Sequence, residues 1–241
     1  MSVPKVLVIT PTTGAPELTD AVDSVLAQTF RGVEHLIVTD GSQFVSRTQS
    51  IIGIEHSSIY HVSLPFNTGS NGFYGHRIMA AFGHLVPHDY VLFLDQDNWI
   101  NPDHVETLVN CCEHKKLDWA YSLREIYNKD KEYVCQDNCE SLGKWEIATS
   151  PGNYLIDTSS YCFSNSFIRA VSHLWDYGWG ADRRFYNIVK TLDQFKYDCS
   201  GHYSLAYRLG GNEGSVTKEF FLYGNQVNKD RYGSVFPWND K

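Results

Sequence analysis

The chain has 241 residues, of which 42% are hydrophobic, 14% aromatic and 20% charged. This length and composition are typical of one ordinary globular domain, or of one domain with an elaborated end. The formal net charge of −8 argues against a general nucleic-acid-binding or acidic-membrane surface. A phosphate group bound here needs a metal ion or a few local cations.

Neither a membrane segment nor a leader is expected. No segment approaches the roughly 18 apolar residues of a membrane helix, and the first residues, MSVPKVLVIT, enter a strand directly. The six cysteines have no N-x-S/T sequon beside them, and CQDNC (135–139) lacks the spacing of a redox or zinc motif. We therefore expect a soluble, cytoplasmic protein with free thiols; a zinc site or disulfide at 135–139 is the less favoured alternative.

Strands and helices alternate along the first half of the chain. KVLVIT (5–10) is a short apolar run rich in β-branched residues, and the turn-forming PTTGAP follows it, so it predicts a buried strand. A helix is predicted to begin at Pro16. Further strands are predicted at 35–40, 59–64 and 90–95, and further helices at 73–86 and 101–112, the last with Asn101 as its N-cap.

This alternation predicts an α/β fold with a parallel sheet covered on both faces. Ligands bind such sheets at the carboxyl ends of the strands. The strands end in polar, turn-rich segments at 10–13, 40–42, 67–69 and 95–97. We expect these four segments to converge on one cleft.

The pattern changes after about residue 117 to mixed strands and aromatic-rich loops. No Pro/Gly/Ser linker or repeat marks a boundary there. We expect one domain over residues 1–241, with about 1–117 forming the main ligand-binding half and about 118–241 completing the site.

Two carboxylates, Asp95 and Asp97, stand one residue apart where the apolar run YVLFLD surfaces. Like charges this close raise each other's pKa unless a cation or a proton lies between them. The pair therefore indicates a bound cation. The alternative is that Asp95 ends the strand while Asp97 and Asn98 form a turn before the helix.

Four motifs occur in a fixed order within residues 4–190. They are VLVITPTTGAPELTDAVDSVLAQTF, HLIVTDGS, NTGSNGFYGHRIMAAF and LDQDNWI. Their order and spacing resemble the inverting, GT-A-fold glycosyltransferases of the family 2 type. The resemblance implies a GT-A fold: a Rossmann-like, mostly parallel sheet flanked by helices, with a mixed C-terminal region on the acceptor side. The first half would then bind a nucleotide sugar.

The resemblance also implies a set of donor contacts. These are Thr10, Pro11, Thr12, Asp40, Asn67, Arg77, Asp95 and Gln96. Asp40 matches the position associated with the nucleotide base, and a carboxylate that accepts from an imide N–H favours uracil and UDP, although guanine also offers such a group. Thr39 departs from the family pattern, and so do Thr12 and Thr13, where an aromatic residue and Asn are usual.

The missing cation would then be Mn²⁺ or Mg²⁺, bound by the D-x-D pair and by the donor diphosphate. Asp97 is the stronger candidate ligand, whereas Asp95 is a candidate for the metal or the ribose. His202, in CSGHYS, is the candidate third ligand, since several GT-A enzymes take a histidine from the C-terminal part. A surface or hydrogen-bonded structural role is its alternative.

A base is needed to accept the proton of the acceptor hydroxyl. The segment GWGADRRFY (178–186) resembles the acidic motif of the family, and Asp182 is its carboxylate. Helix capping alone is the alternative role. The aromatic and glycine residues just before it, 175–180, form either a sugar-stacking loop or part of the core.

Three more residues are candidates with two interpretations each. Arg208 and Lys218 would grip the diphosphate from a C-terminal segment, or would be solvated surface cations. Asp157 would contact the acceptor or cap a turn.

The sequence thus predicts a metal-dependent inverting glycosyltransferase that moves a sugar from a nucleotide-diphosphate donor, UDP favoured, to a glycan or other hydroxyl acceptor. A nucleotidyltransferase is the first alternative, although the glycine-rich loop and basic residue expected after its first strand are missing from TPTTGAPE. A nucleotide- or carbohydrate-binding module without turnover is the second.

Overall fold

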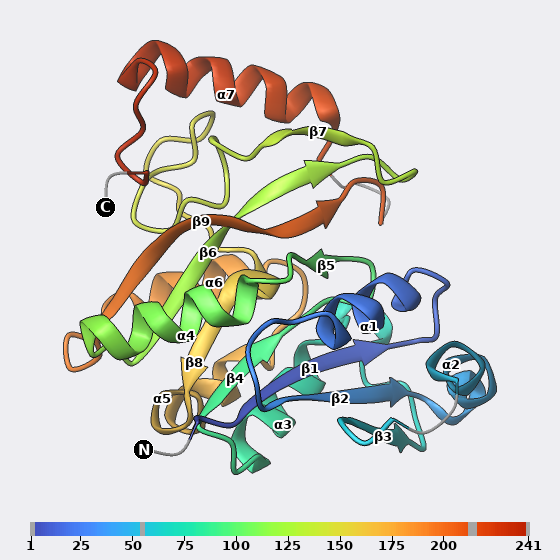
Figure 1. Cartoon of the computed structure of the whole chain (residues 1–241). Helices are drawn as coiled ribbons and strands as arrows, with labels where there is room; N and C mark the ends of the chain where they lie inside the picture. Colours follow the sequence, from blue (N-terminus) through green and yellow to red (C-terminus); the bar gives the residue numbers. More distant parts are fainter. Residues whose placement is uncertain (1–2, 54–55, 212–215, 240–241) are drawn as a thin grey trace.

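The computed structural model describes residues 3–53, 56–211 and 216–239. Figure 1 shows how the elements are arranged. The first half contains β1 (Val6–Thr12), α1 (Leu18–Leu26), β2 (Val33–Asp40), α2 (Val45–Ile52), β3 (Ile59–Leu64), α3 (His76–Leu85), β4 (Tyr90–Phe93), β5 (Trp99–Ile100) and α4 (His104–Lys115). The second half contains β6 (Trp119–Tyr127), β7 (Tyr133–Gln136), β8 (Tyr161–Ser164), α5 (Asn165–Val171), α6 (Ala181–Val189), β9 (Tyr197–Arg208) and α7 (Lys218–Tyr232). Short 3₁₀ helices lie at Ser42–Phe44, Ser70–Gly72, Thr158–Ser160 and Ser172–Trp175.

The strands and helices predicted in the first half are confirmed to within a few residues. Two details differ. The N-cap of α4 is Asp103, and the Asn101 side chain instead donates to the Tyr203 carbonyl at 3.3 Å. Helix α2 is missing from the prediction because Thr48 is its one buried residue, so its sequence lacks the apolar repeat of a helix packed into a core.

Within the described residues, the strands form a nine-stranded sheet in the order β3–β2–β1–β4–β8–β6–β9–β5, with β7 paired to β6. The pairs among β3, β2, β1 and β4 are parallel. Strand β8 is antiparallel to both β4 and β6, whereas β9 is parallel to β6. The parallel sheet is thus confirmed for the first half, and the expected mixed region begins at β8.

Helices cover both faces of this sheet. Alternate residues of a strand point to opposite faces: Leu7 and Ile9 of β1 belong to a core with α3, α5 and α6, whereas Val6 and Val8 belong to a second core with α1 and α4. The continuous apolar sequence of β1 is typical of a strand buried on both sides.

Helix α7 lies at the far end of the molecule from β3, next to β7 (Figure 1). A third apolar cluster of Ile126, Cys139, Ala148 and Phe221 holds it there. Gly224 allows the close approach, because a Cβ at this position would lie 2.7 Å from Cys139 Sγ.

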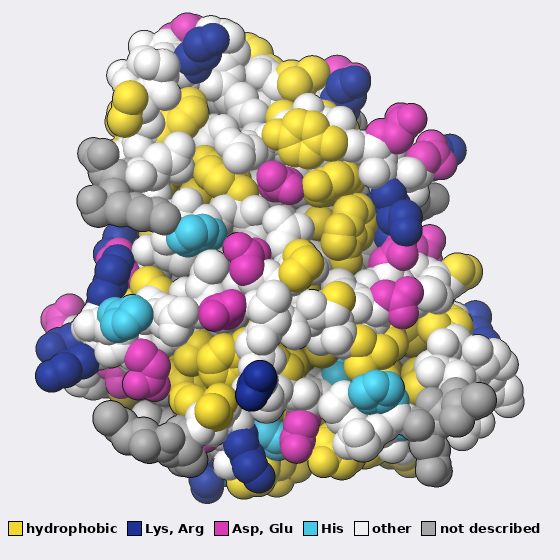
Figure 2. Space-filling view, viewed as in Figure 1, with side chains coloured by type: hydrophobic (Ala, Val, Ile, Leu, Met, Phe, Trp, Pro, Cys, Tyr) yellow, Lys and Arg dark blue, Asp and Glu magenta, His cyan; other side chains and the backbone are white. Residues whose placement is uncertain are grey.

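All six cysteines are free, as predicted. Among the helices that the structure describes, none is long and apolar enough to cross a membrane. On the face shown in Figure 2, Lys and Arg side chains are dispersed among Asp and Glu. This face therefore has no continuous basic surface of the kind that binds nucleic acid, as expected from the acidic net charge.

Candidate active site

A cleft of about 520 Å³ opens at the carboxyl ends of β1, β2 and β4. The loops after these strands and after β3 form one wall, and residues of the second half form the other. The lining includes Pro11, Thr12, Thr13, Asp40, Asn67, Gly69, Asp95, Gln96, Asp97, Asn98, Asp157, Asp182, Arg183 and Arg208. The predicted convergence of four polar loops is therefore confirmed.

The D-x-D pair lies in this cleft directly after β4. The Asp95 backbone N–H donates to Ser159 Oγ at 3.0 Å, and this hydroxyl lies 3.4 Å from Asp95 Oδ2. Burial raises the pKa of the Asp95 carboxyl well above its usual value, and the Asp97 and Asp157 carboxylates add to the shift. Burial and Asp157 also raise the pKa of Asp97. A cation beside these carboxylates would relieve both effects.

The pair offers hard oxygen ligands, which suit Mg²⁺ and Mn²⁺. In the part of the chain that the structure describes, no group of three or more His, Cys, Asp and Glu side chains is placed to hold a metal ion. A cation bound by Asp95 and Asp97 would therefore take its other ligands from a bound molecule or from water. A Cβ at Gly211 would lie 2.3 Å from Asp97 Oδ2, so the chain after β9 passes directly over this carboxylate.

His202 is not the third ligand, and that prediction is wrong. Its segment, expected to be a loop, lies inside β9, where Gly201 has a φ of 74° and the register with β6 shifts. The cleft lies near Arg208, at the end of this strand. Six residues of extended strand span about 20 Å, which separates His202 from the D-x-D pair.

Gln96 fastens the loop after β1 to the loop after β4. Its side-chain oxygen accepts from the Thr12 hydroxyl at 2.6 Å and from the Thr13 N–H at 3.1 Å. The Thr12 hydroxyl in turn accepts from the Gly14 N–H at 2.8 Å. Thr12, Gln96 and Pro11 all line the cleft, as donor contacts require. A ligand there would meet a loop that is already held in place.

Thr10 does not line the cleft, and its predicted role as a donor contact is wrong. Strand β1 extends to Thr12, two residues beyond its predicted end, so Thr10 is fully buried within the sheet. Its Oγ1 lies 2.8 Å from Nε2 of His35 on β2. Burial lowers the pKa of His35 to about 3, so the ring is neutral at ordinary pH.

Asp40 orders the loop after β3. Its Oδ1 accepts from the Thr68 N–H at 2.7 Å and from the Thr68 hydroxyl at 2.9 Å, and its Oδ2 accepts from the Gly69 N–H at 2.7 Å. A carboxylate oxygen can accept two hydrogen bonds, so Oδ2 keeps a site for an N–H of a base. Nearby, Asn67 Oδ1 is buried without a hydrogen-bond partner among the described residues. Asp40 and Asn67 thus offer unfilled acceptors on the donor side of the cleft.

Arg77 is not among the described residues that line the cleft. Its Nε lies 3.1 Å from Asp176 Oδ1, one guanidinium nitrogen donates to the Thr68 carbonyl at 3.3 Å, and the group stacks 3.5 Å from the Phe73 ring centre. The predicted donor contact is therefore wrong in this geometry. The alternative for an arginine on this predicted helix, that it holds a neighbouring carboxylate, is confirmed by the contact with Asp176.

Arg208 and Lys218 do not grip a diphosphate either. Arg208 is buried, and its guanidinium donates to the Asp97 carbonyl at 2.9 Å, to the Lys129 carbonyl at 3.1 Å and to the Asp20 carboxylate. It thus fixes the backbone of the D-x-D loop. Lys218 is exposed in the first turn of α7 and is not among the described residues that line the cleft.

Asp182 lies in the first turn of α6, behind Gly180 with a φ of 80°. The N-cap of α6 is Gly180, so Asp182 is not the capping residue, although its Oδ1 accepts from the Arg183 backbone N–H at 2.7 Å and its charge lies in the first turn. Burial raises the pKa of its carboxyl, and Asp157 adds to the shift, although Arg183 and His76 oppose it. The carboxylate also lines the cleft. A raised pKa makes a carboxylate a better proton acceptor.

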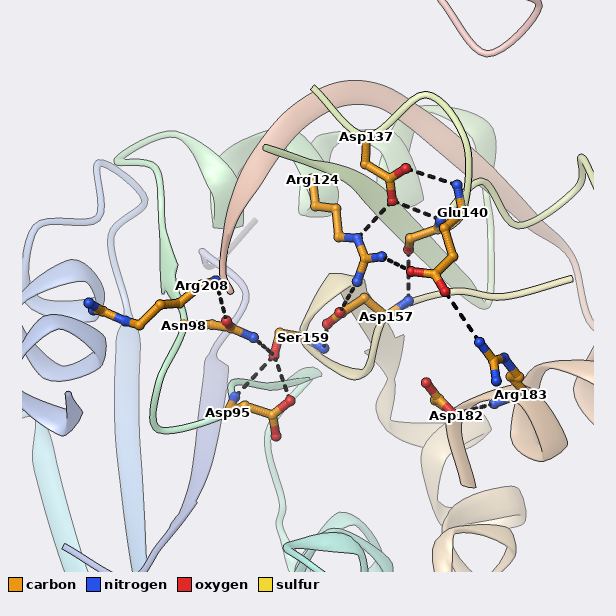
Figure 3. Close-up of polar contacts among 11 residues, drawn as sticks. Asp95, Asn98, Arg124, Asp137, Glu140, Asp157, Ser159, Asp182, Arg183 and Arg208 are labelled. Carbon is orange, nitrogen blue, oxygen red and sulfur yellow. Dashed lines mark hydrogen bonds and ion pairs between the residues drawn. The ribbon is translucent and has the colours of Figure 1, made fainter. Parts of the chain in front are cut away.

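A buried ion-pair network joins the two sides of the cleft (Figure 3). Most of its members are not among the candidate residues predicted from the sequence. Arg124 of β6 is 2% exposed and pairs with Asp137 at 2.8 Å, with Asp157 at 2.6 Å and with Glu140. Arg183, next to Asp182, reaches the second Glu140 oxygen at 3.2 Å.

The network continues toward the D-x-D pair. Asp157 Oδ1 accepts from the Ser159 N–H at 2.9 Å, which caps the 3₁₀ turn at Thr158–Ser160, and Ser159 contacts Asp95. The capping interpretation of Asp157 is confirmed. Figure 3 shows Asp95 and Arg183, with its neighbour Asp182, at the two ends of this chain of contacts.

A signal for the network was present in the sequence. Arg124 stands within the apolar strand sequence YSLREIY, and an arginine at a buried strand position needs carboxylate partners. The segment CQDNCE supplies two of them, Asp137 and Glu140. Strand pairing, which brings this segment back to Arg124, is what local sequence does not specify.

Comparisons with known proteins agree with this geometry. A family model described as Glycosyl transferase family 2 matches residues 7–169. Glycosyltransferase GlyA of Streptococcus pneumoniae is 32% identical over 137 residues, which are 53% of this chain and 18% of GlyA.

Similarity to solved structures confirms the predicted GT-A fold. Residues 1–349 of S. aureus TarS superimpose with a TM-score of 0.57 at 15% identity, over 85% of this chain and 60% of that fragment. The same fragment in complex with UDP-GlcNAc gives 0.55 at 14% identity, over 87% and 60%. The chain thus spans less than a fifth of GlyA and about 60% of these TarS structures. Because the family model covers more than half of its sequence, the chain belongs to glycosyl transferase family 2.

Proposed function

We propose that this chain is a metal-dependent inverting glycosyltransferase that moves a sugar from a UDP-linked donor to a hydroxyl group of a glycan or another acceptor. The observation that carries the proposal is the placement of Asp182 in the same cleft as the D-x-D pair. Membership of the family supports the reaction class. The TarS complexes with UDP-GlcNAc and with UDP support the donor class.

The donor would lie over the carboxyl ends of β1, β2 and β4. There, Asp40 Oδ2 and Asn67 Oδ1 offer acceptors for N–H and O–H groups of the nucleoside. Gln96 and Arg208 hold the two loops that would enclose the diphosphate. Six free thiols are consistent with a cytoplasmic location, which we include in the proposal.

Asp97 and Asp95 would hold Mn²⁺ or Mg²⁺ between them and the donor. When bound, such an ion supplies positive charge to the diphosphate and so makes UDP a better leaving group. The two carboxylates orient the ion, while Ser159 and Arg208 fix the carboxylates and the loop that carries them. Without the ion, the donor phosphates would face the cluster of carboxylates directly.

Asp182 would act as the base. The acceptor hydroxyl attacks the anomeric carbon from the side opposite UDP, its proton passes to an Asp182 oxygen, and the bond from the anomeric carbon to the diphosphate oxygen breaks. One C–O bond forms, one breaks, and the configuration at the anomeric carbon inverts. The Arg183 N–H holds Oδ1, so the second oxygen is the one that takes the proton.

The test is Asp182→Asn, with Asp193→Asn as the matched control at an exposed site. Asn keeps the size of Asp, and its Oδ1 can still accept from the Arg183 N–H, so the melting temperature and the donor affinity should stay close to wild type. The transfer rate should fall by about 10²- to 10⁴-fold, the usual contribution of a general base. Asp193→Asn should leave all three unchanged.

Two results would contradict the proposal. A near-normal rate for Asp182→Asn would remove it from the catalytic role. A product whose anomeric configuration, determined by NMR, equals that of the donor would exclude single displacement even if the rate fell.

A further inference from the structure

Trp179 is exposed, although tryptophan side chains are largely buried in most folded proteins. Its side chain is 74% exposed, and it lines the cleft three residues before Asp182. Other tryptophans lie fully in the core: Trp119, Trp175 and Trp238. Leaving so large an apolar surface in water is unfavourable, and within a cleft it indicates contact with a ligand.

The loop that carries Trp179 is fixed by its neighbours. His76 Nδ1 lies 2.9 Å from the Tyr177 carbonyl oxygen. Arg184 donates to the Leu174 carbonyl at 2.8 Å, and its guanidinium packs 4.8 Å from the Tyr177 ring centre. The backbone of the loop that presents the indole is therefore held in place beside the cleft.

One face of the indole ring lies toward Arg183. The Arg183 guanidinium lies 5.9 Å from the centre of the Trp179 ring, on one of its sides. The ring is flanked by Gly178 and Gly180, which carry no side chain that could cover the other face. That face is open to a flat ligand with an apolar surface, such as the C–H face of a pyranose ring.

The charges on this side of the cleft select a neutral ligand. Asp157, Glu140 and Asp182 all line it. The cations are already paired: Arg124 contacts three carboxylates, and Arg183 contacts Glu140. A phosphate or carboxylate on the acceptor would add negative charge beside these groups and beside the donor diphosphate, which costs electrostatic free energy.

We propose that Trp179 is the platform for the acceptor, and that the acceptor is a neutral hexopyranoside whose C–H face stacks on the indole while one of its hydroxyls faces Asp182. This inference rests on the proposed glycosyltransferase function, and it narrows the acceptor from any hydroxyl compound to a neutral sugar ring.

The experiment compares wild type, Trp179→Ala, Trp179→Phe and Tyr223→Ala. Tyr223 is 68% exposed on α7 and is not among the described residues that line the cleft, so it is the matched control. The acceptors are methyl β-D-glucopyranoside, methyl β-D-galactopyranoside and the negatively charged methyl β-D-glucuronide. A panel of UDP-sugars serves as donors, and hydrolysis of the donor by water is measured in parallel.

Trp179→Ala should raise the KM for a neutral acceptor by about tenfold or more, whereas Trp179→Phe, which keeps a flat ring, should raise it by no more than about threefold. Donor KM and donor hydrolysis should stay within about twofold in both variants, and Tyr223→Ala should match wild type. The glucuronide should be at least about tenfold poorer than the glucoside in kcat/KM. An unchanged acceptor KM in Trp179→Ala, or preference for the glucuronide, would overturn the inference.

Binding of the methyl glycosides is also followed by tryptophan fluorescence, which needs no turnover. A change in emission in wild type that is absent in Trp179→Phe supports the platform, and an equal change in both, or none in wild type, overturns it. If wild type binds in this way but neither transfers nor hydrolyses any UDP-sugar, the proposed function fails while the sugar platform stands.

Discussion

Two buried histidines should make the stability of this fold depend on pH in a measurable way. His35 and His104 are each 1% exposed. His35 Nε2 contacts the Thr10 hydroxyl, and His104 Nδ1 lies 2.8 Å from Ser204 Oγ. Burial lowers the pKa of both rings to about 3, so both are neutral in the folded protein at any moderately acidic pH.

The sign follows from comparing the folded and unfolded chains. An unfolded histidine has a pKa of about 6.5 and takes up a proton as the pH falls, whereas these folded rings do not until about pH 3. The contribution of these two neutral histidines to the unfolding free energy is therefore fully present above about pH 6.5, and it is lost progressively as the pH falls from about 6.5 to about 3. At about pH 5, which is about 1.5 units below the pKa of an unfolded histidine, protonation stabilises the unfolded chain by about 2 kcal/mol for each of the two histidines.

The assay is urea unfolding at about pH 8 and about pH 5 for wild type, His35→Leu and His104→Leu, with the exposed His84→Leu as control. Only the change in unfolding free energy between the two pH values is compared, so any loss of packing in a variant cancels. Each buried-site variant should lose about 2 kcal/mol less than wild type on acidification. If His35→Leu and His104→Leu lose as much as wild type, the buried rings are not the origin of the pH dependence.

Three further predictions concern the cleft. Asp97→Ala should abolish both Mn²⁺ stimulation and sugar transfer while the melting temperature stays near wild type; full activity of the wild-type protein in EDTA would refute the metal requirement. Asp40→Asn should raise the donor KM by about tenfold or more with a smaller effect on kcat, because an amide N–H₂ cannot accept from the loop or from a base; a selective loss of kcat would contradict this. Arg124→Met should lower the unfolding free energy by about 3–5 kcal/mol, since it leaves three buried carboxylates without their cation; an unchanged urea midpoint would show that the network is dispensable.

The first half of the fold was predictable because its elements repeat a local pattern. Val6 to Ile9 are apolar without interruption because both faces of β1 are covered. Helix α2 escaped prediction for the opposite reason, since Thr48 is its one fully buried residue and Ile51 and Ile52 are only partly buried against the core. Periodicity reports burial, and an element with little buried surface gives little signal.

The second half depends on strand order, which local sequence does not encode. Strand β8 inserts between β4 and β6, and this insertion places Ser159 beside Asp95 and Asp157 beside Arg124. The prediction of His202 failed for a different, local reason: Gly201 was interpreted as a loop residue, but in the structure it marks an irregularity within β9.

The placement of charges explains why donor and cation should bind together. Every arginine that lines the described cleft, Arg124, Arg183 and Arg208, is paired with carboxylates. Under the proposed function, a UDP-sugar entering alone would bring its diphosphate against Asp95 and Asp97, and none of these arginines is free to meet it. A divalent ion entering alone would find two carboxylates and, among the described residues, no third protein ligand. In the proposed mechanism each ligand would complete the site of the other. The factor by which the cation raises donor affinity should then equal the factor by which the donor raises cation affinity.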